Sequence, residues 1–85
     1  MHYVYVLQSE NSEYIYVGST NDLERRVKEH NKGQNYATKK YIPLKLVYYE
    51  AYLDKKDASN REHKLKHHGS AIGHLKKRLF NSLVK

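Results

Sequence analysis

Five polar side chains of this 85-residue sequence fall on strand or helix faces that should otherwise be apolar. Two are tyrosines on neighbouring predicted strands, two lie one helical turn apart, and one lies on a later helix. They are Tyr5, Tyr16, Arg26, His30 and Glu62. Because burying an unpaired charge is costly, such positions usually indicate a satisfied internal network or a cleft that faces a ligand.

Together these residue types supply the groups that hydrolysis of a phosphodiester requires. A phenol takes or relays the proton of an attacking water when its pKa is lowered, and a guanidinium stabilises the negative charge that grows on the phosphate. A carboxylate such as Glu62 holds Mg²⁺ or Mn²⁺, with water and phosphate oxygens completing a six-coordinate shell. A single acidic ligand favours a hydrated, substrate-bridged metal over a tight site that stands without substrate.

Each of these residues taken alone also has a structural explanation. Tyrosine on a half-buried sheet face is more often packing than catalysis, and an arginine at the edge of an apolar stripe commonly extends its charge to water. A lone histidine is usually structural. The hypothesis of a site therefore depends on the elements that bring the five together.

The two tyrosines lie on a predicted β-hairpin. Residues 2–8 and 14–18 alternate with period two, and the polar segment 9–13 between them predicts a short turn. One face of the hairpin is aliphatic, with Val4, Val6 and Val17 among its residues. We expect this face to pack on the core, which leaves four tyrosines on the other face.

The arginine and the histidine lie on a predicted helix over residues 22–31. Asn21 has capping-box spacing to a glutamate three positions later, and Gly33 follows the helix as a suitable end. The apolar stripe and the polar residues that flank it are Leu23, Val27, Arg26 and His30. Arg25 falls on the solvent side by the same periodicity.

The rest of the chain predicts a third strand over residues 44–53 and two further helices. Asp54 caps a helix that reaches residue 67 or 68, with Glu62 inside its apolar stripe. Ser70 caps a last helix with one apolar side, formed by Ile72, Leu75, Leu79 and Leu83. The order β, β, α, β, α, α predicts one α/β (α+β) domain over residues 1–85, a small three-stranded antiparallel or mixed sheet flanked by three helices.

The positive charge of the chain is confined to its last third. Lys and Arg number 16 against 9 Asp and Glu, a net charge of +7, yet residues 1–54 are balanced. A one-sided basic surface attracts polyanions. We expect phosphate contacts without sequence specificity from Lys64, Lys66, Lys76, Lys77 and Arg78, the alternative being a solvated helix surface.

Composition excludes several other classes of protein. The chain has no cysteine, which excludes a disulfide scaffold, Cys-ligated zinc and a thiol nucleophile. No apolar run approaches the ~20 residues of a membrane span, and the N-terminus lacks the regions of a signal peptide. We therefore expect a cytoplasmic protein with no membrane partner.

Four segments in order carry a family pattern. The tripeptide YVY at 3–5 and YVG at 16–18 place two tyrosines eleven residues apart, residues 18–31 form an arginine helix, and residues 58–66 form a glutamate helix. In these features the sequence resembles the GIY-YIG endonucleases, over about residues 3–79. The resemblance is strongest to their small single-domain bacterial type, which is similar to the N-terminal domain of the excision-repair nuclease.

The resemblance assigns a role to each of the five residues. It implies Tyr5 as the candidate general base for water, Tyr16 as its hydrogen-bonding partner at the scissile phosphate, and Arg26 as the clamp of the transition state. It also implies His30 as an assisting group and Glu62 as the ligand of one divalent metal, Mg²⁺ or Mn²⁺.

The sequence departs from the family pattern in two places. Tyr3 stands where the first motif has glycine, which a strand tolerates because the tyrosine two places later supplies the chemistry. Many members also place an asparagine or another polar residue after the glutamate helix. His74 and Asn81 are the candidates for that position here.

Three hypotheses for function follow. The first is a metal-dependent endonuclease that hydrolyses DNA, single-stranded, branched, flapped or damaged, in repair or recombination. The second is a non-catalytic nucleic-acid-binding module that uses the basic C-terminal helices. The third is a nuclease subunit that cuts only with a targeting protein partner, because no DNA-recognition domain is appended.

Overall fold

The computed structural model describes residues 1–83 of the chain and has the α+β architecture that the sequence predicts. The last two residues of the predicted domain lie outside the described part. In chain order the elements are β1 (His2–Ser9), β2 (Ile15–Thr20), α1 (Leu23–Asn31), a short 3-10 helix η1 (Lys39–Tyr41), β3 (Leu44–Tyr52), α2 (Lys55–His67) and α3 (Gly69–Arg78).

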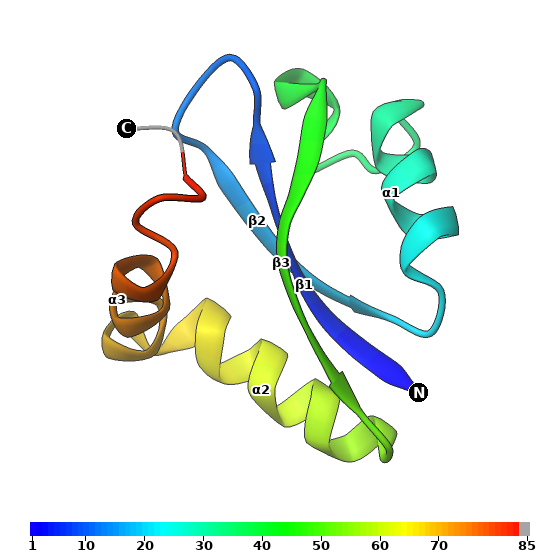
Figure 1. Ribbon diagram of the computed structural model, residues 1–85. Helices are drawn as coiled ribbons and strands as arrows, with labels where there is room; N and C mark the ends of the chain where they lie inside the picture. Colours follow the sequence, from blue (N-terminus) through cyan, green and yellow to red (C-terminus); the bar gives the residue numbers. More distant parts are fainter. Residues whose placement is uncertain (84–85) are drawn as a thin grey trace.

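The three strands form one antiparallel sheet in the order β2-β1-β3 (Figure 1). The hairpin register pairs Tyr5 with Gly18 and Leu7 with Tyr16. Since side chains alternate between faces along a strand, this register places Tyr5 and Tyr16 on the same face. β1 is the central strand, and β2 and β3 are the two edges.

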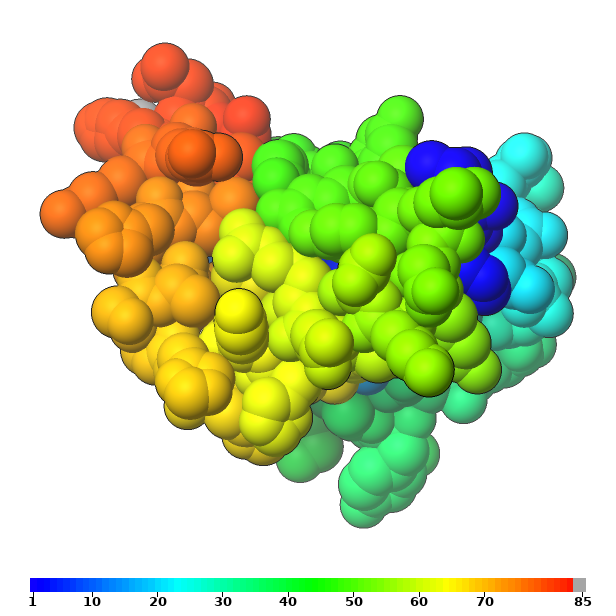
Figure 2. All heavy atoms as spheres, turned by 90° about the horizontal axis from the view of Figure 1, so that it is seen from below, coloured from blue at the N-terminus to red at the C-terminus, as the bar shows by residue number. Residues whose placement is uncertain are grey.

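Each face of the sheet carries its own apolar cluster. Val4, Val6 and Val17 pack under α2 and α3, which lie together on one side of the sheet (Figures 1 and 2). The tyrosine face is also covered: Tyr5 packs with Leu7 and with the apolar stripe of α1. The expectation of a core on the aliphatic face alone was therefore incomplete, because α1 folds back over the other face.

The helix starts agree with prediction at one position and differ at two. Asp54 caps α2 as predicted, its side chain accepting from the backbone N of Lys56. The cap of α1 is Asp22, which accepts from the backbone N of Arg25 at 3.1 Å, so the expected cap at Asn21 was wrong by one residue.

The last helix also differs from its predicted limits. Ser70 does not cap it, because α3 already begins at Gly69 directly after α2 and has no side-chain cap. The helix ends at Arg78, one residue before the buried Leu79. Leu83 still packs against the core, but from the turns that follow the helix. No helix in residues 1–83 is long and apolar enough to cross a membrane.

A polar cluster joins the edge strand β3 to α2. The Glu50 carboxylate accepts two hydrogen bonds from Arg61 Nε, at 3.0 and 3.1 Å, and one from Arg61 Nη2 at 3.0 Å. Tyr48 and Tyr52 also donate their hydroxyls to it. These bonds hold the pKa of Glu50 below its ordinary value although burial alone would raise it. The cluster is therefore an ionised, fully paired tie between two elements.

Candidate active site

Tyr5 and His30 form the buried centre of the candidate site. The Tyr5 hydroxyl lies 2.8 Å from Nε2 of His30, and the two side chains are 1% and 0% exposed. On the far side of the ring, Nδ1 of His30 lies 2.8 Å from the hydroxyl of Thr38, which is also fully buried. The structure thus forms a chain of three hydrogen-bonding groups from β1 through α1 to the segment before η1.

The protonation states give this chain a direction. The lowered phenol pKa that the sequence-based hypothesis required is not found: burial raises the pKa of Tyr5 to about 12, although the hydrogen bond and charge of Arg26 partly offset it, so the phenol carries its proton at pH 7. Burial and the nearby Arg26 charge lower the pKa of His30, so its ring is neutral. Because a guanidinium only donates, the Tyr5 proton is directed to Nε2 of His30, and Nδ1–H then donates to Thr38.

Gly18 makes room for the phenol. A Cβ at this position would clash with the hydroxyl and the ring of Tyr5, which crosses the neighbouring strand there. The hairpin register places the two residues directly opposite each other. A residue with no side chain is therefore required at position 18 for Tyr5 to reach His30.

Arg26 brings a positive charge to the phenol from the adjacent turn of α1. Its Nη1 donates to Glu29 Oε1 at 2.9 Å, and 32% of its side chain is exposed. The bond to Glu29 raises the pKa of Arg26, and the proximity of Tyr5 raises it further. Arg25 is 59% exposed and pairs with Asp22, on the solvent side as its periodicity predicts.

Tyr16 lies close to Tyr5, to His30 and to Lys66 of α2. Its ring centroid is 6.4 Å from that of Tyr5 and 5.2 Å from that of His30. The ammonium of Lys66 lies over the Tyr16 ring, 5.1 Å from its centroid. Since α2 packs on the opposite face of the sheet, Lys66 reaches this ring past the edge strand β2.

Glu62 lies at the same edge, one turn before Lys66. Its Oε1 accepts from the Ser19 hydroxyl at 2.7 Å, and its Oε2 pairs with Lys66 Nζ at 2.9 Å. Burial alone would raise its pKa, but the bonds from Lys66 and Ser19 lower it below the ordinary value. Glu62 is therefore an anion held where β2 and α2 meet, and its negative charge contributes to the raised pKa of Tyr5.

The donor set fits one hard divalent cation. An ionised carboxylate, 23% exposed and oriented by Ser19, is the oxygen ligand that Mg²⁺ and Mn²⁺ prefer. Within residues 1–83 no group of three or more His, Asp or Glu side chains could hold a metal ion. A cation held by Glu62 would therefore take most of its ligands from water and phosphate.

The structure separates the predicted phosphate contacts. Lys66 joins the candidate site through Glu62 and Tyr16. The other four are exposed on α2 and on the last turn of α3, namely Lys64, Lys76, Lys77 and Arg78. His74 and Asn81, the candidates for a further polar member of the site, are also exposed, on α3 and in the turn after it.

Sequence reasoning missed Thr38 and Ser19. Ser19 had a signal, because it lies two residues after Val17 and so on the face that α2 covers. Thr38 had none, since it lies in a polar stretch without a period and reaches His30 only through the path of the loop. Thr38 orients His30 and Ser19 orients Glu62, and neither adds a further reacting group to the site.

The sequence matches the family model of the GIY-YIG catalytic domain over residues 1–79. The chain therefore belongs to the GIY-YIG family, which supports a nuclease-type function with DNA as substrate.

Within this family the chain is similar to proteins of the UPF0213 group. It is 43% identical to a UPF0213 protein of Clostridium perfringens over 67 residues, 78% of this chain and 71% of the relative. It is 41% identical to one of Haloquadratum walsbyi over 66 residues, 76% of this chain and 73% of the relative. The solution NMR structure of a UPF0213 protein from Bacillus halodurans matches with a TM-score of 0.53 and 32% identity, covering 94% of this chain and 82% of that one.

Proposed function

We propose that this protein is a divalent-metal-dependent endonuclease that hydrolyses phosphodiester bonds of DNA. One observation carries the proposal: the Tyr5 hydroxyl lies 2.8 Å from Nε2 of a fully buried histidine, with the Arg26 guanidinium beside the phenol and the Glu62 carboxylate at the adjacent strand edge. The arrangement combines a path for a proton from Tyr5 to His30 with a cationic group, Arg26, and an anionic group, Glu62. A structural role for Tyr5 would need neither.

The proposed reaction uses Tyr5 and His30 as a relay. The Tyr5 proton passes to Nε2 of His30, and the phenolate takes a proton from the attacking water. Thr38 accepts from Nδ1–H and so stabilises the imidazolium that forms. The hydroxide then forms the new bond to phosphorus as the bond to the leaving oxygen breaks, the leaving alkoxide takes a proton from solvent water, and His30 releases its extra proton to solvent.

The other residues act on the phosphate. Arg26 neutralises charge on the non-bridging oxygens, and the Tyr16 hydroxyl hydrogen-bonds at the scissile phosphate. Glu62 would hold Mg²⁺ or Mn²⁺, which when bound would supply Lewis-acid stabilisation of the same charge. Lys66, next to Glu62, contacts the phosphate backbone beside the site, while Lys64, Lys76, Lys77 and Arg78 hold more distant phosphates.

The proposed substrate includes an unpaired strand, as in single-stranded, branched or flapped DNA. Tyr3 and Tyr49 meet edge to face with centroids 5.9 Å apart, on the same sheet face as Tyr5, and Tyr49 is 53% exposed. Exposed aromatic rings of this kind stack on unpaired bases. A DNA substrate also favours the cytoplasm as the compartment, a role in repair or recombination, and a protein partner that selects the place of cutting.

Cleavage assays on the purified chain test the proposal. Branched and single-stranded DNA are incubated with Mg²⁺ or Mn²⁺, with EDTA as the metal-free control. We expect metal-dependent cleavage, and a loss of at least about 100-fold in Glu62→Gln and in Tyr5→Phe. Both variants keep the shape of the side chain, so far-UV circular dichroism should match the wild type.

Two results would contradict this assignment. Cleavage that persists undiminished in both variants would exclude the site. Salt-dependent DNA binding with no turnover under any metal, unchanged by Glu62→Gln, would support the non-catalytic binding module in its place.

A further inference from the structure

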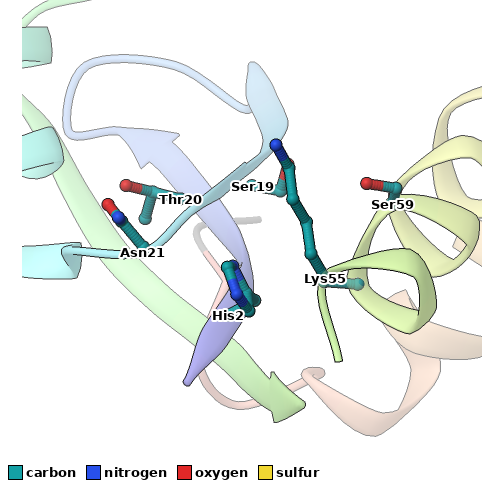
Figure 3. A pocket seen from close by; sticks show the side chains of 7 residues that line it. His2, Ser19, Thr20, Asn21, Lys55 and Ser59 are labelled. Atoms are coloured by element: carbon teal, nitrogen blue, oxygen red, sulfur yellow. The ribbon is translucent and has the colours of Figure 1, made fainter. Parts of the chain in front are cut away.

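A polar pocket lies where β2 and α2 meet. It is a pocket of about 290 Å³ beside the ends of β1 and β2 and the first two turns of α2. In Figure 3 Lys55 extends from α2 toward Ser19 of β2, with Ser59 further along the helix. Its polar lining consists of His2, Ser19, Thr20, Asn21, Lys55 and Ser59.

The pocket is continuous with the candidate active site. Ser19 lines the pocket and donates its hydroxyl to Glu62, so one side chain belongs to both. On α2, positions 55, 59, 62 and 66 follow the i, i+4, i+7, i+11 spacing of a single helix edge. Lys55 and Lys66 therefore flank Glu62 along the same edge, with the pocket at the Lys55 end.

The chemistry of the pocket suits one nucleotide unit of a strand. Lys55 supplies a cation, and three hydroxyls and the amide of Asn21 supply donors and acceptors for a sugar or a base edge. No carboxylate lines it, and the nearest one in sequence, Asp54, already accepts from a backbone N. An anionic, hydrogen-bonding group is therefore favoured over an apolar one.

We propose that this pocket is a subsite for the nucleotide next to the scissile phosphate, with Lys55 contacting its phosphate. The inference rests on the proposed function, because it takes the scissile phosphate to lie at Glu62. The substrate strand then follows the seam between β2 and α2, with one lysine on each side of the metal position.

Equilibrium binding tests the role of Lys55 without catalysis. Fluorescence anisotropy of a labelled single-stranded oligonucleotide is measured in EDTA over a range of salt concentrations. For Lys55→Ala we expect the slope of log affinity against log salt to fall by about 0.7, which corresponds to one phosphate contact on a single strand. Lys56→Ala is the matched control, since it removes the same charge from the next residue of α2, which does not line the pocket.

A substitution that fills the pocket separates shape from charge. Ser59→Phe should weaken binding several-fold without changing the net charge, while Asn60→Phe, one residue further on the exposed helix surface, should not. Equal effects in Lys55→Ala and Lys56→Ala, or in the two phenylalanine variants, would overturn the subsite.

The outcome for the subsite is distinct from that for the proposed function. If the wild type binds but never cuts, the endonuclease proposal fails, and the slopes still decide the pocket. If the wild type cuts and Lys55→Ala leaves KM and the slope unchanged, the subsite fails and the endonuclease stands. A raised KM with an unchanged kcat in Lys55→Ala supports both.

Discussion

Two clusters of this molecule combine arginine, glutamate and tyrosine, at opposite edges of the sheet. At the β3 edge, Glu50 collects hydrogen bonds from Arg61, Tyr48 and Tyr52, so every donor ends on one carboxylate. At the β2 edge, the Tyr5 hydroxyl donates to a neutral imidazole instead. A carboxylate in the first cluster only fixes the tyrosines, whereas an imidazole in the second can accept a proton at neutral pH.

The comparison also shows why a shifted pKa does not identify a site. The pKa of Tyr5 and that of Tyr52 are both raised to about 12. For Tyr52, burial and the hydrogen bond to the Glu50 anion both raise the pKa, and the charge of Arg61 opposes them in part. For Tyr5, burial is opposed by the charge of Arg26, which favours the phenolate. An arginine charge opposes burial in both cases, so the partner of the hydroxyl, an imidazole for Tyr5 and a carboxylate for Tyr52, distinguishes the two tyrosines better than the pKa does.

The largest expected contrast is between the two arginines. Arg26→Ala should lower the cleavage rate by about 100- to 1000-fold, because a donor to the developing charge is lost. Its free energy of unfolding should change by less than about 1 kcal/mol, because the ion pair with Glu29 is partly exposed. Arg61→Ala should instead cost about 2 kcal/mol, since Glu50 loses its charged partner, and leave the rate nearly unchanged.

Urea denaturation and single-turnover kinetics on both variants measure this contrast. Arg26→Lys and Arg61→Lys serve as controls, because lysine keeps the charge but not the planar fork. A loss of stability without loss of rate in Arg26→Ala, or the reverse in Arg61→Ala, would show that the roles of the two clusters have been interchanged.

Gly18 tests whether the Tyr5 position is imposed by packing. Gly18→Ala should destabilise the fold by about 1–3 kcal/mol, because a Cβ there overlaps the phenol and forces it from His30. Gly73→Ala is the matched control: apart from its chain neighbours and the local helix backbone, no atom of the described residues lies within 4 Å of its added Cβ, and alanine in α3 should stabilise by about 0.5–1 kcal/mol. Thermal unfolding of the two variants measures both effects, and an unchanged Gly18→Ala would contradict the close approach.

The two clusters should respond to pH in separate ranges. The folded pKa of His30 lies below its ordinary 6.5, so the unfolded chain binds its proton first and stability falls as pH drops below about 6.5. In the proposed reaction kcat/KM should fall about tenfold per pH unit below the His30 pKa, because imidazolium cannot accept the Tyr5 proton.

The pKa of Glu50 is lowered for a different reason from that of His30: hydrogen bonds stabilise the charged carboxylate, whereas burial disfavours the charged imidazole. Its folded pKa is lowered, so its stabilisation is present above the ordinary 4.5 and is lost as pH falls through the folded value. Urea midpoints and rates measured from pH 8 to pH 3 separate the two ranges. Loss of rate that begins only with the acid unfolding near Glu50 would exclude His30 from the proton path.

Alternation along the strands was sufficient to predict much of the candidate site. Period two placed Tyr5 and Tyr16 on one face, and the helical spacing placed Arg26 and His30 on one stripe, because both depend only on local geometry. The packing of α1 on the tyrosine face was not predicted, because alternation along a short strand does not show whether its second face is also buried.

The partners that complete the site could not be predicted, for a physical reason. Lys66 was predicted only as a phosphate contact, and its bond to Glu62 and its approach to Tyr16 depend on how α2 lies along the β2 edge. The tie of Glu50 to Arg61 likewise joins residues of a strand and a helix whose relative position is set by packing. Local sequence patterns predict which residues share a face of a strand or helix, but they do not predict the contacts between separate elements.

The helix caps give the smallest and most local prediction. Asp22→Ala should lower the free energy of unfolding by about 1 kcal/mol, because the backbone N of Arg25 loses its acceptor. Asn21→Ala should have little effect, since its amide only accepts from Arg25 Nη2 at 3.4 Å on the exposed surface. Asp54→Ala removes the equivalent cap of α2, the helix that carries Arg61 and Glu62, and should cost a similar amount. If the contacts of His30 with Tyr5 and Thr38 are what hold α1 in place, Asp22→Ala will lower the urea midpoint and leave the cleavage rate within about twofold. A parallel loss of rate would show that the cap itself positions Arg26.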